Sequence, residues 1–177
     1  MTVKIRAATL TDVSDLEILI PESVRALQRH HYSVAQMEGA LGTVFGVDTQ
    51  LIRDGTYLIA ESESNEIVGC GGWSKRKTLF GSDQVPGKDD AWLDPLQDAA
   101  RIRAFFVHPA WARQGIGSRI LQACESAARA QGFTRLELVA TLPGEPLYSA
   151  HGYRPLEKFE VPLSNGVSLP VIRMGKP

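Results

Sequence analysis

The sequence predicts an α/β protein, formed as one domain over residues 1–177, with a central mixed, mostly antiparallel sheet and helices on both faces. Three observations predict this class. Short strand-like segments interchange with amphipathic helical segments along the chain. Two pairs of strand-like segments are joined by turn residues, which indicates antiparallel hairpins. The length suits one compact core, and no repeat or composition shift marks a second domain.

Composition excludes several classes of protein. The chain is 44% hydrophobic and 22% charged, with no apolar run long enough to span a bilayer, so we expect a soluble protein. The net charge of −1 gives no global attraction to nucleic acid or to a membrane. The first residues lack the pattern of a secretion signal, which favours the cytoplasm. Cys70 and Cys124 are isolated, and the adjacent His30 and His31 lack ligand spacing, so we expect free thiols and no metal site.

The first half of the chain predicts a strand, two helices and a hairpin. The segment TVKIRAAT reads as an edge strand, and TLTDVSDLEILI begins a helix with Thr9 or Thr11 as its N-cap. The segment SVAQMEGALG predicts a short helix that Gly42 ends. The segments TYLIAES and IVGCGGWS, separated by the turn ESNE, predict a hairpin.

The second half predicts a long loop and then alternating strands and helices. Residues 75–99 are rich in glycine, proline and aspartate, which predicts a functional or mobile loop. Its acids either attract a cationic amine or keep the loop soluble, and the cations of WSKRKTLF are expected to be solvated rather than to bind nucleic acid. The segments ARIRAFFVHP and FTRLELVAT predict strands, and EPLYSAHG predicts a short helix. The pair Asn165-Gly166 predicts a final hairpin.

The segment HPAWARQGIGSRIL places Gly115 and Gly117 between a strand and an amphipathic helix that Gly132 ends. Unpaired amides at such a helix start favour an anion, and the missing side chains let a phosphate approach. The alternative is a tight turn or a close packing contact without a ligand. A dinucleotide fold is disfavoured although Glu137 lies 20 residues beyond Gly117, because Ile120 takes the place of the third glycine. No Gly-Lys-Ser or Gly-Lys-Thr of a P-loop is present.

The segments AFFVHPAWARQGIGSRIL and LYSAHGY resemble the acetyl-CoA-binding core of the GNAT (Gcn5-related) N-acetyltransferases. The resemblance implies that two central strands, ending at Val107 and near Ala140, run parallel and splay apart to admit the coenzyme. It also implies that backbone amides wrap the coenzyme pyrophosphate and that one strand pairs with the pantetheine arm. The implied cofactor-binding residues are Phe105, Phe106, Val107, Arg113, Gln114, Gly115, Ile116, Gly117, Ser118 and Thr141. Ala112 and Thr141 depart from the family pattern, which has Gln or Arg and Asn there.

The resemblance implies acetyl transfer from acetyl-CoA to a primary amine of a small molecule or a protein. Tyr148 matches the family tyrosine, so we expect it to be the acid that protonates the leaving thiolate. An amide within Phe105–Val107 would stabilise the oxyanion. The general base is left open among Glu61, Glu137, His108, His151 and a water relay. A non-catalytic acyl-CoA sensor on the same fold is the alternative, and the edge strand permits a homodimer.

Overall fold

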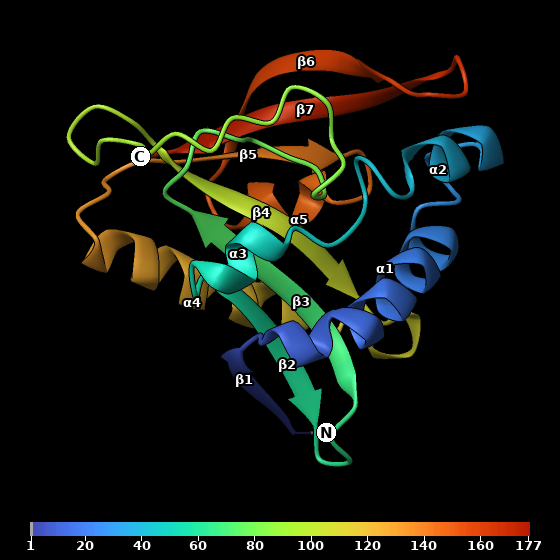
Figure 1. Cartoon of the computed structure of the whole chain (residues 1–177), viewed down its shortest axis with the longest axis horizontal. Helices are drawn as coiled ribbons and strands as arrows, with labels where there is room; N and C mark the ends of the chain where they lie inside the picture. The colour runs from blue at the N-terminus through green and yellow to red at the C-terminus, as the bar shows by residue number, and fades with distance from the viewer. Residues whose placement is uncertain (1) are drawn as a thin grey trace.

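The computed structural model describes residues 2–177 and forms one seven-stranded sheet in the order β1-β2-β3-β4-β5-β7-β6 (Figure 1). All neighbouring strands are antiparallel except β4 and β5, which are parallel. The sheet is therefore mixed and mostly antiparallel, as the sequence predicts. The strands are β1 (Val3–Ala7), β2 (Tyr57–Ser62), β3 (Ile67–Ser74), β4 (Ala100–Val107), β5 (Leu136–Thr141), β6 (Arg154–Pro162) and β7 (Ser168–Lys176).

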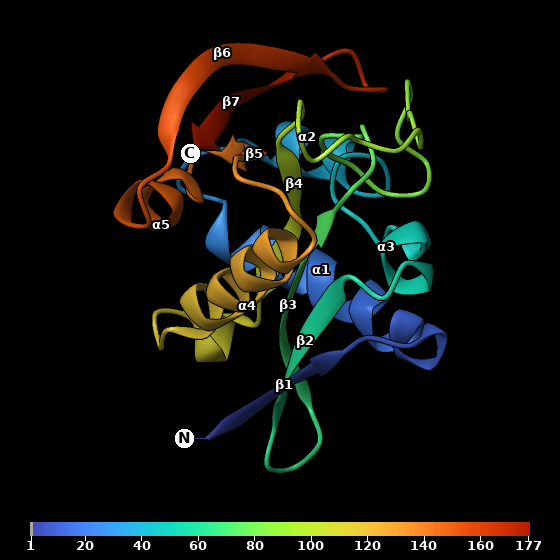
Figure 2. The same ribbon diagram turned by 90° about the vertical axis from the view of Figure 1, so that its left-hand side faces the viewer.

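Helices cover both faces of the sheet, as the sequence predicts (Figure 2). One face carries α1, α2 and α3, and the other carries α4 and α5, so the sheet separates two hydrophobic cores. The α-helices are α1 (Val13–Leu27), α2 (Val34–Ala40), α3 (Thr49–Arg53), α4 (Ile116–Ala130) and α5 (Glu145–Ala150). None of them, within residues 2–177, is long and apolar enough to cross a membrane.

Most element boundaries follow from the predicted caps and turns. Thr9 is the N-cap of a short 3-10 turn, Leu10–Asp12, and its amide donates to the Asp12 carboxylate at 2.7 Å. The N-cap of α1 itself is Asp12, not Thr9 or Thr11 as the sequence predicts. Left-handed glycines follow α2 and α4, at Gly42 with φ 92° and Gly132 with φ 95°. Helix α3, a single turn whose N-cap is Asp48, is not predicted from the sequence.

The two parallel strands separate soon after they meet. They pair only at Ala100 with Leu136 and at Arg101 with Glu137. Beyond this point β5 continues alongside β7 and β4 continues alongside β3, and the two strands diverge in Figure 1. The predicted parallel pairing and splaying of these central strands is confirmed. The side of β4 that faces β5 therefore presents unpaired backbone over the strand's second half.

A β-bulge interrupts β4 in that unpaired half. Gly72 pairs with Arg103 and Cys70 pairs with Phe106, so one residue of β3 lies opposite two residues of β4. Ala104 is the extra residue, and its φ of 58° places it in the left-handed region. That conformation costs a non-glycine residue about 1–2 kcal/mol. The bulge turns the Phe105 side chain toward the face that α4 covers.

Candidate active site

The segment that precedes α4 is an open backbone loop with free amides. Arg113 and Gly115 both have left-handed backbones, with φ of 60° and 81°. Within residues 2–177, the amides of residues 113–118 donate to no backbone or side-chain acceptor. A Cβ built on Gly115 would meet nothing within 4 Å. Left-handed residues followed by a helix start make a concave array of donors that suits an anion such as a pyrophosphate.

Helix α5 packs against the start of α4 and borders the site on one side. A Cβ built on Gly117 would lie 3.2 Å from the Leu147 methyl Cδ2, so the glycine lets α5 approach. His151 Nε2 lies 3.0 Å from Ser118 Oγ, which joins the end of α5 to the first turn of α4. Gly115 is thus open to a ligand. Gly117 also allows the close packing of α5 against α4, which is the alternative that the sequence left open for these glycines.

Tyr148 lies on α5 with its ring buried between two other aromatic rings. Its ring centroid is 6.1 Å from that of Phe105 and 5.9 Å from that of Tyr153, both in edge-on arrangements. Burial, with a smaller contribution from the Cys124 thiol, raises the pKa of Tyr148 well above its usual value. The phenol therefore keeps its proton at neutral and mildly alkaline pH, which is the state that an acid needs.

The unpaired side of β4 brings its backbone toward the same site. Phe105 and Val107 face the core beneath α4, whereas Phe106 faces the opposite core, where its ring lies 6.1 Å from that of Phe45. An extended ligand can add to such an unpaired strand through main-chain hydrogen bonds. Thr141 ends β5 and uses its hydroxyl to accept from the Gly144 amide at 3.1 Å, which caps the turn into α5.

The four side chains considered as a general base all have partners. Glu137 accepts from Arg101 at 2.9 Å and from Arg173 at 2.8 Å, so both of its oxygens are used. Glu61 pairs with Arg6 at 2.8 Å. His108 Nδ1 accepts from a backbone amide at 3.1 Å, and His151 contacts Ser118 as described above. The structure thus disfavours the two carboxylates as free bases and gives each histidine a local structural contact.

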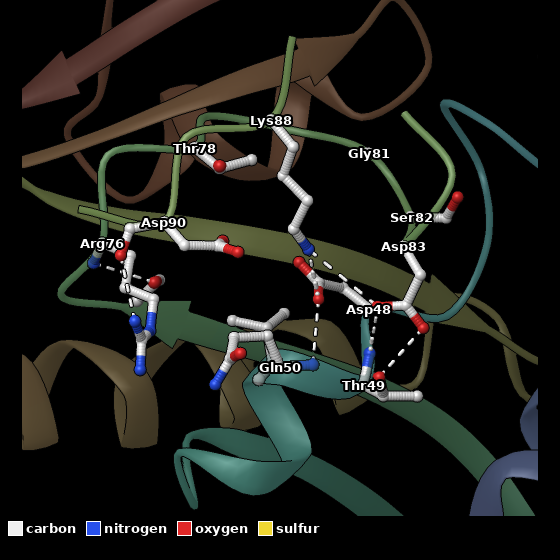
Figure 3. A network of polar contacts seen from close by, with 12 residues as sticks. Asp48, Thr49, Gln50, Arg76, Thr78, Gly81, Ser82, Asp83, Lys88 and Asp90 are labelled. Carbon is white, nitrogen blue, oxygen red and sulfur yellow. Dashed lines mark hydrogen bonds and ion pairs between the residues drawn. The ribbon is translucent and has the colours of Figure 1, made fainter. Parts of the chain in front are cut away.

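A buried group of charges around Asp48, the N-cap of α3, links the long loop of residues 75–99 to Arg103 of β4. Arg103 is 3% exposed and donates to Asp48 at 2.9 Å, and it also donates to the Gly81 carbonyl at 2.8 Å. Lys88 reaches the same Asp48 carboxylate at 2.7 Å (Figure 3). Burial opposes ionisation, but Lys88 and Arg103 outweigh it and hold the pKa of Asp48 below its usual range.

The acids of this loop and its neighbours mostly make structural contacts. Asp83 accepts from the Thr49 amide and hydroxyl, both at 2.9 Å (Figure 3). Asp89 and Asp94 accept from backbone amides two residues ahead. These hydrogen bonds indicate that the acids support the loop. They disfavour the alternative, in which the acids attract a cationic amine.

The cations of WSKRKTLF and the two cysteine thiols lie outside the proposed cradle of residues 113–118. The sequence predicts solvated cations in WSKRKTLF, whereas Arg76 pairs with Asp54 at 2.7 Å and stacks on the Trp92 ring at 3.8 Å. Cys70 and Cys124 are free and buried. No group of three or more His, Cys, Asp or Glu side chains within residues 2–177 is arranged to hold a metal ion.

The bulge at Ala104 is not predicted from the sequence, although Phe105 and Phe106 beside it are predicted site residues. One signal for it was present. The segment RIRAFFV begins with alternating side chains and then places two aromatic residues in succession, which breaks the two-residue period of a strand. A β-bulge reconciles such a break with one buried side chain on each face.

Comparison with known proteins gives a family and a fold. Residues 53–155 match the family described as the acetyltransferase (GNAT) domain. A GCN5-related N-acetyltransferase from Rhodopseudomonas palustris has a TM-score of 0.72 and 20% identity, with 99% of this chain and 96% of that chain covered. A phosphinothricin acetyltransferase from Sinorhizobium meliloti, solved with AcCoA, has a TM-score of 0.66 and 18% identity, covering 100% and 89%.

A ribosomal-protein-alanine N-acetyltransferase from Brucella melitensis has a TM-score of 0.63 and 18% identity, covering 98% of each chain. No curated protein sequence matches this chain. Because these solved structures are at most 20% identical to this chain, their similarity shows the fold alone. The family match spans more than half of the chain and includes the loop before α4.

Proposed function

Because this chain belongs to the GNAT family of acetyltransferases, we propose that it is an N-acetyltransferase whose acceptor is a primary amine of a small molecule or a protein. The observation that carries this proposal is the convergence of three features on one site. They are the free amides of residues 113–118, the unpaired second half of β4, and the buried, protonated Tyr148. A phosphate cradle, a strand edge and an acid together match what transfer from a coenzyme A thioester requires.

The cradle residues have distinct parts in this proposal. The amides of Gln114, Gly115, Ile116, Gly117 and Ser118 bind the pyrophosphate, and the exposed Arg113 adds a positive charge beside them. This charge compensates for Ala112, which offers no polar group. Thr141 orients the turn into α5, since its hydroxyl already serves the Gly144 amide. Backbone of Phe105, Phe106 and Val107 pairs with the extended arm of the coenzyme.

Acetyl-CoA supplies the activated acyl group when it is bound. An amide within Phe105–Val107 donates to the thioester oxygen and stabilises the negative charge that develops there. The amine nitrogen attacks the thioester carbon, and Tyr148 donates its phenolic proton to the sulfur as the carbon–sulfur bond breaks. The nitrogen of the new amide loses one proton to a base or to water, and solvent returns a proton to Tyr148. Its raised pKa keeps this proton on the phenol at neutral pH. The amine must arrive neutral or lose its proton to His108, His151 or a water relay, because Glu61 and Glu137 are held by arginines.

The fold does not select one acceptor class. Solved structures with this fold include enzymes named for phosphinothricin and for an alanine of a ribosomal protein, so both small-molecule and protein amines stay in the proposal. Two buried free thiols support a reducing, cytoplasmic environment. The net charge of −1 disfavours nucleic acid as a partner, and the outer strand β6 offers an edge through which a homodimer can form.

The experiment that tests this proposal is a calorimetric titration of the purified protein with acetyl-CoA, with NADH as the control. Saturable binding of acetyl-CoA alone is expected. A thermal-shift assay at a hundredfold excess over the dissociation constant should then report stabilisation of roughly 2.7 kcal/mol. Absence of acetyl-CoA binding would refute the cradle.

An amine screen with acetyl-CoA present separates the enzyme from the non-catalytic acyl-CoA sensor. Release of free coenzyme A thiol that depends on an added amine supports the enzyme. Tight binding of acetyl-CoA with no amine-dependent thiol release, across small amines and amino-terminal peptides, would favour the sensor.

A further inference from the structure

A tyrosine outside the proposed site holds the bulge of β4 from the opposite face of the sheet. Tyr57 lies at the start of β2, is 1% exposed, and donates its hydroxyl to the Ala104 carbonyl at 2.7 Å. Ala104 is the left-handed bulge residue, and its strained backbone persists only where surrounding contacts fix it. The Tyr57 hydroxyl is a buried contact of this kind, and it reaches the bulge from a strand two positions away in the sheet.

Two adjacent glycines of β3 make room for this arrangement, one on each face. A Cβ built on Gly72 would lie 2.8 Å from Tyr57 Cδ1 and 2.6 Å from the Thr56 carbonyl oxygen. A Cβ built on Gly71 would lie 2.6 Å from Phe105 Cδ1. Real Cβ atoms do not approach so closely, so larger residues here would displace the Tyr57 ring or the Phe105 ring.

The bulge in turn determines which ring meets Tyr148. Successive side chains of a strand point to opposite faces, and the extra residue Ala104 shifts this alternation by one position. Phe105 therefore lies on the face of α4 and α5, with its ring 6.1 Å from that of Tyr148. Without the bulge, the Phe105 side chain would lie on the face that α1, α2 and α3 cover, and its contact with the Tyr148 ring would be lost.

We propose that Tyr57 is a positioning residue for acetyl transfer, because its hydroxyl holds the Ala104 bulge that sets Phe105 against Tyr148. This inference rests on the proposed function for its catalytic consequence and on geometry alone for the positioning. Arg103 supports the same stretch of β4 through its bonds to Asp48 and to the Gly81 carbonyl. The Tyr57 hydroxyl donates to Ala104 and, within residues 2–177, makes no hydrogen bond to the cradle residues 113–118.

The test removes the hydroxyl and keeps the ring. Tyr57→Phe should lower kcat about tenfold, whereas the dissociation constant for acetyl-CoA should rise by less than about fivefold, since the cradle is untouched and only the β4 contacts with the coenzyme arm change. The matched control is Thr56→Val. It removes the neighbouring buried hydroxyl, which donates to the Leu51 carbonyl at 3.3 Å, and has no contact with the bulge. Equal kcat in the two variants, measured well below their melting temperatures, would overturn the proposal.

A second variant separates positioning from a general loss of stability. Glycine adopts the left-handed region without strain, so Ala104→Gly in the Tyr57→Phe background should recover much of the lost kcat. A merely destabilised protein would not recover kcat in this way, because the glycine also removes a methyl group from the core. Failure of the glycine to raise kcat would count against the bulge as the cause.

An NMR measurement tests the positioning independently of activity. The nuclear Overhauser contact between the Phe105 and Tyr148 rings should weaken in Tyr57→Phe and persist in Thr56→Val. An unchanged contact in Tyr57→Phe would overturn the proposal even if kcat fell. If the wild-type protein transfers no acetyl group, the proposed function fails, and the ring contact still decides whether Tyr57 holds the bulge.

Discussion

At the scale of single residues, Tyr148 combines a buried ring with a hydroxyl that keeps its proton. Tyr148→Phe should lower kcat by about a hundred- to ten-thousand-fold, because general acid catalysis contributes on that order. The dissociation constant for acetyl-CoA should change little, since the ring still packs between Phe105 and Tyr153. Steady-state kinetics and calorimetry on the same preparation check both expectations.

Tyr153→Phe is the matched control for Tyr148→Phe. Its hydroxyl donates to Glu125 at 2.7 Å, away from the cradle, and its ring packs on Tyr148 in the same edge-on way. The control should lose some stability and keep most of its kcat. A kcat for Tyr148→Phe that equals the value for Tyr153→Phe would remove Tyr148 from the acid role.

Single residues also show where sequence reasoning ends. Gly115 and Tyr148 are predicted as site residues from the sequence because each belongs to a local motif whose spacing along the chain is visible. Tyr57 and Ala104 are 47 positions apart, and their contact arises only when β2, β3 and β4 are assembled. Asp48 likewise shows its partner Arg103 only in the folded protein, since 55 positions separate them. Contacts between distant strands leave no pattern in a single sequence.

At the scale of elements, α4 and α5 share the proposed cradle, and its two glycines should respond differently to substitution. Gly115→Val places a side chain in open space and strains a left-handed backbone, so acetyl-CoA should bind at least about tenfold more weakly. Gly117→Val pushes Leu147, and with it the helix that carries Tyr148. It should therefore lower both coenzyme affinity and kcat.

Calorimetry and saturating kinetics distinguish these two outcomes. The kcat of Gly115→Val, measured at saturating acetyl-CoA, should stay close to the wild-type value. Circular dichroism confirms that each variant is folded. Unaltered acetyl-CoA affinity in both variants would contradict the cradle as the pyrophosphate site.

The loop of residues 75–99 is fastened to β4 by charges that are buried together. Asp48→Asn leaves Arg103 and Lys88 without their shared carboxylate, and removal of one partner from a buried pair costs about 3–5 kcal/mol. Urea unfolding should show this loss in the midpoint. Asp90→Asn, an exposed acid in the same loop, should stay within about 0.5 kcal/mol of wild type. Equal urea midpoints for Asp48→Asn and the wild-type protein would show that the buried ion pair adds nothing to the stability.

Prediction from sequence succeeded best for elements with their own local signals. The hairpin turns, the glycines that end helices and the periodicity of α4 each specify structure within a few neighbouring residues. Helix α3 was missed because it is a single turn, Thr49–Arg53, whose N-cap Asp48 resembles an ordinary loop acid in sequence. Its position depends on the buried contact with Arg103, which is a tertiary effect.

At the scale of the whole molecule, we propose that residues 1–177 unfold as one cooperative domain. The sheet contributes side chains to both hydrophobic cores, with Ile102 in one and Phe106 in the other, so neither core can open alone. Trp73 lies in the core beneath α4, with its ring 6.2 Å from that of Phe133. Tryptophan fluorescence, to which Trp73 contributes together with Trp92 and Trp111, and the far-UV circular dichroism should give coincident urea transitions. Two separated transitions would indicate two independent units.

The stability of the whole molecule should also fall in acid. Burial raises the pKa of Asp54, but hydrogen bonds from Arg76 and Gln50 outweigh it and hold the pKa below its usual value of 3.8. The hydrogen bond from Arg6 lowers the pKa of Asp12 in the same direction. The unfolded chain therefore binds more protons than the folded protein as the pH falls below about 4. Stability from these pairs is complete above that pH and is lost progressively below it.

Asp54→Asn provides the test of this linkage. The variant should be less stable than wild type at pH 7, because it lacks the charged partner of Arg76. Protonation removes the same charge from the wild-type protein in acid, so the two free energies of unfolding should converge as the pH falls from about 4 toward about 2. Urea titrations at several pH values measure both curves. Parallel curves over that range would mean that the Asp54 carboxylate has the same pKa in the folded and unfolded states, contrary to the ion pair with Arg76.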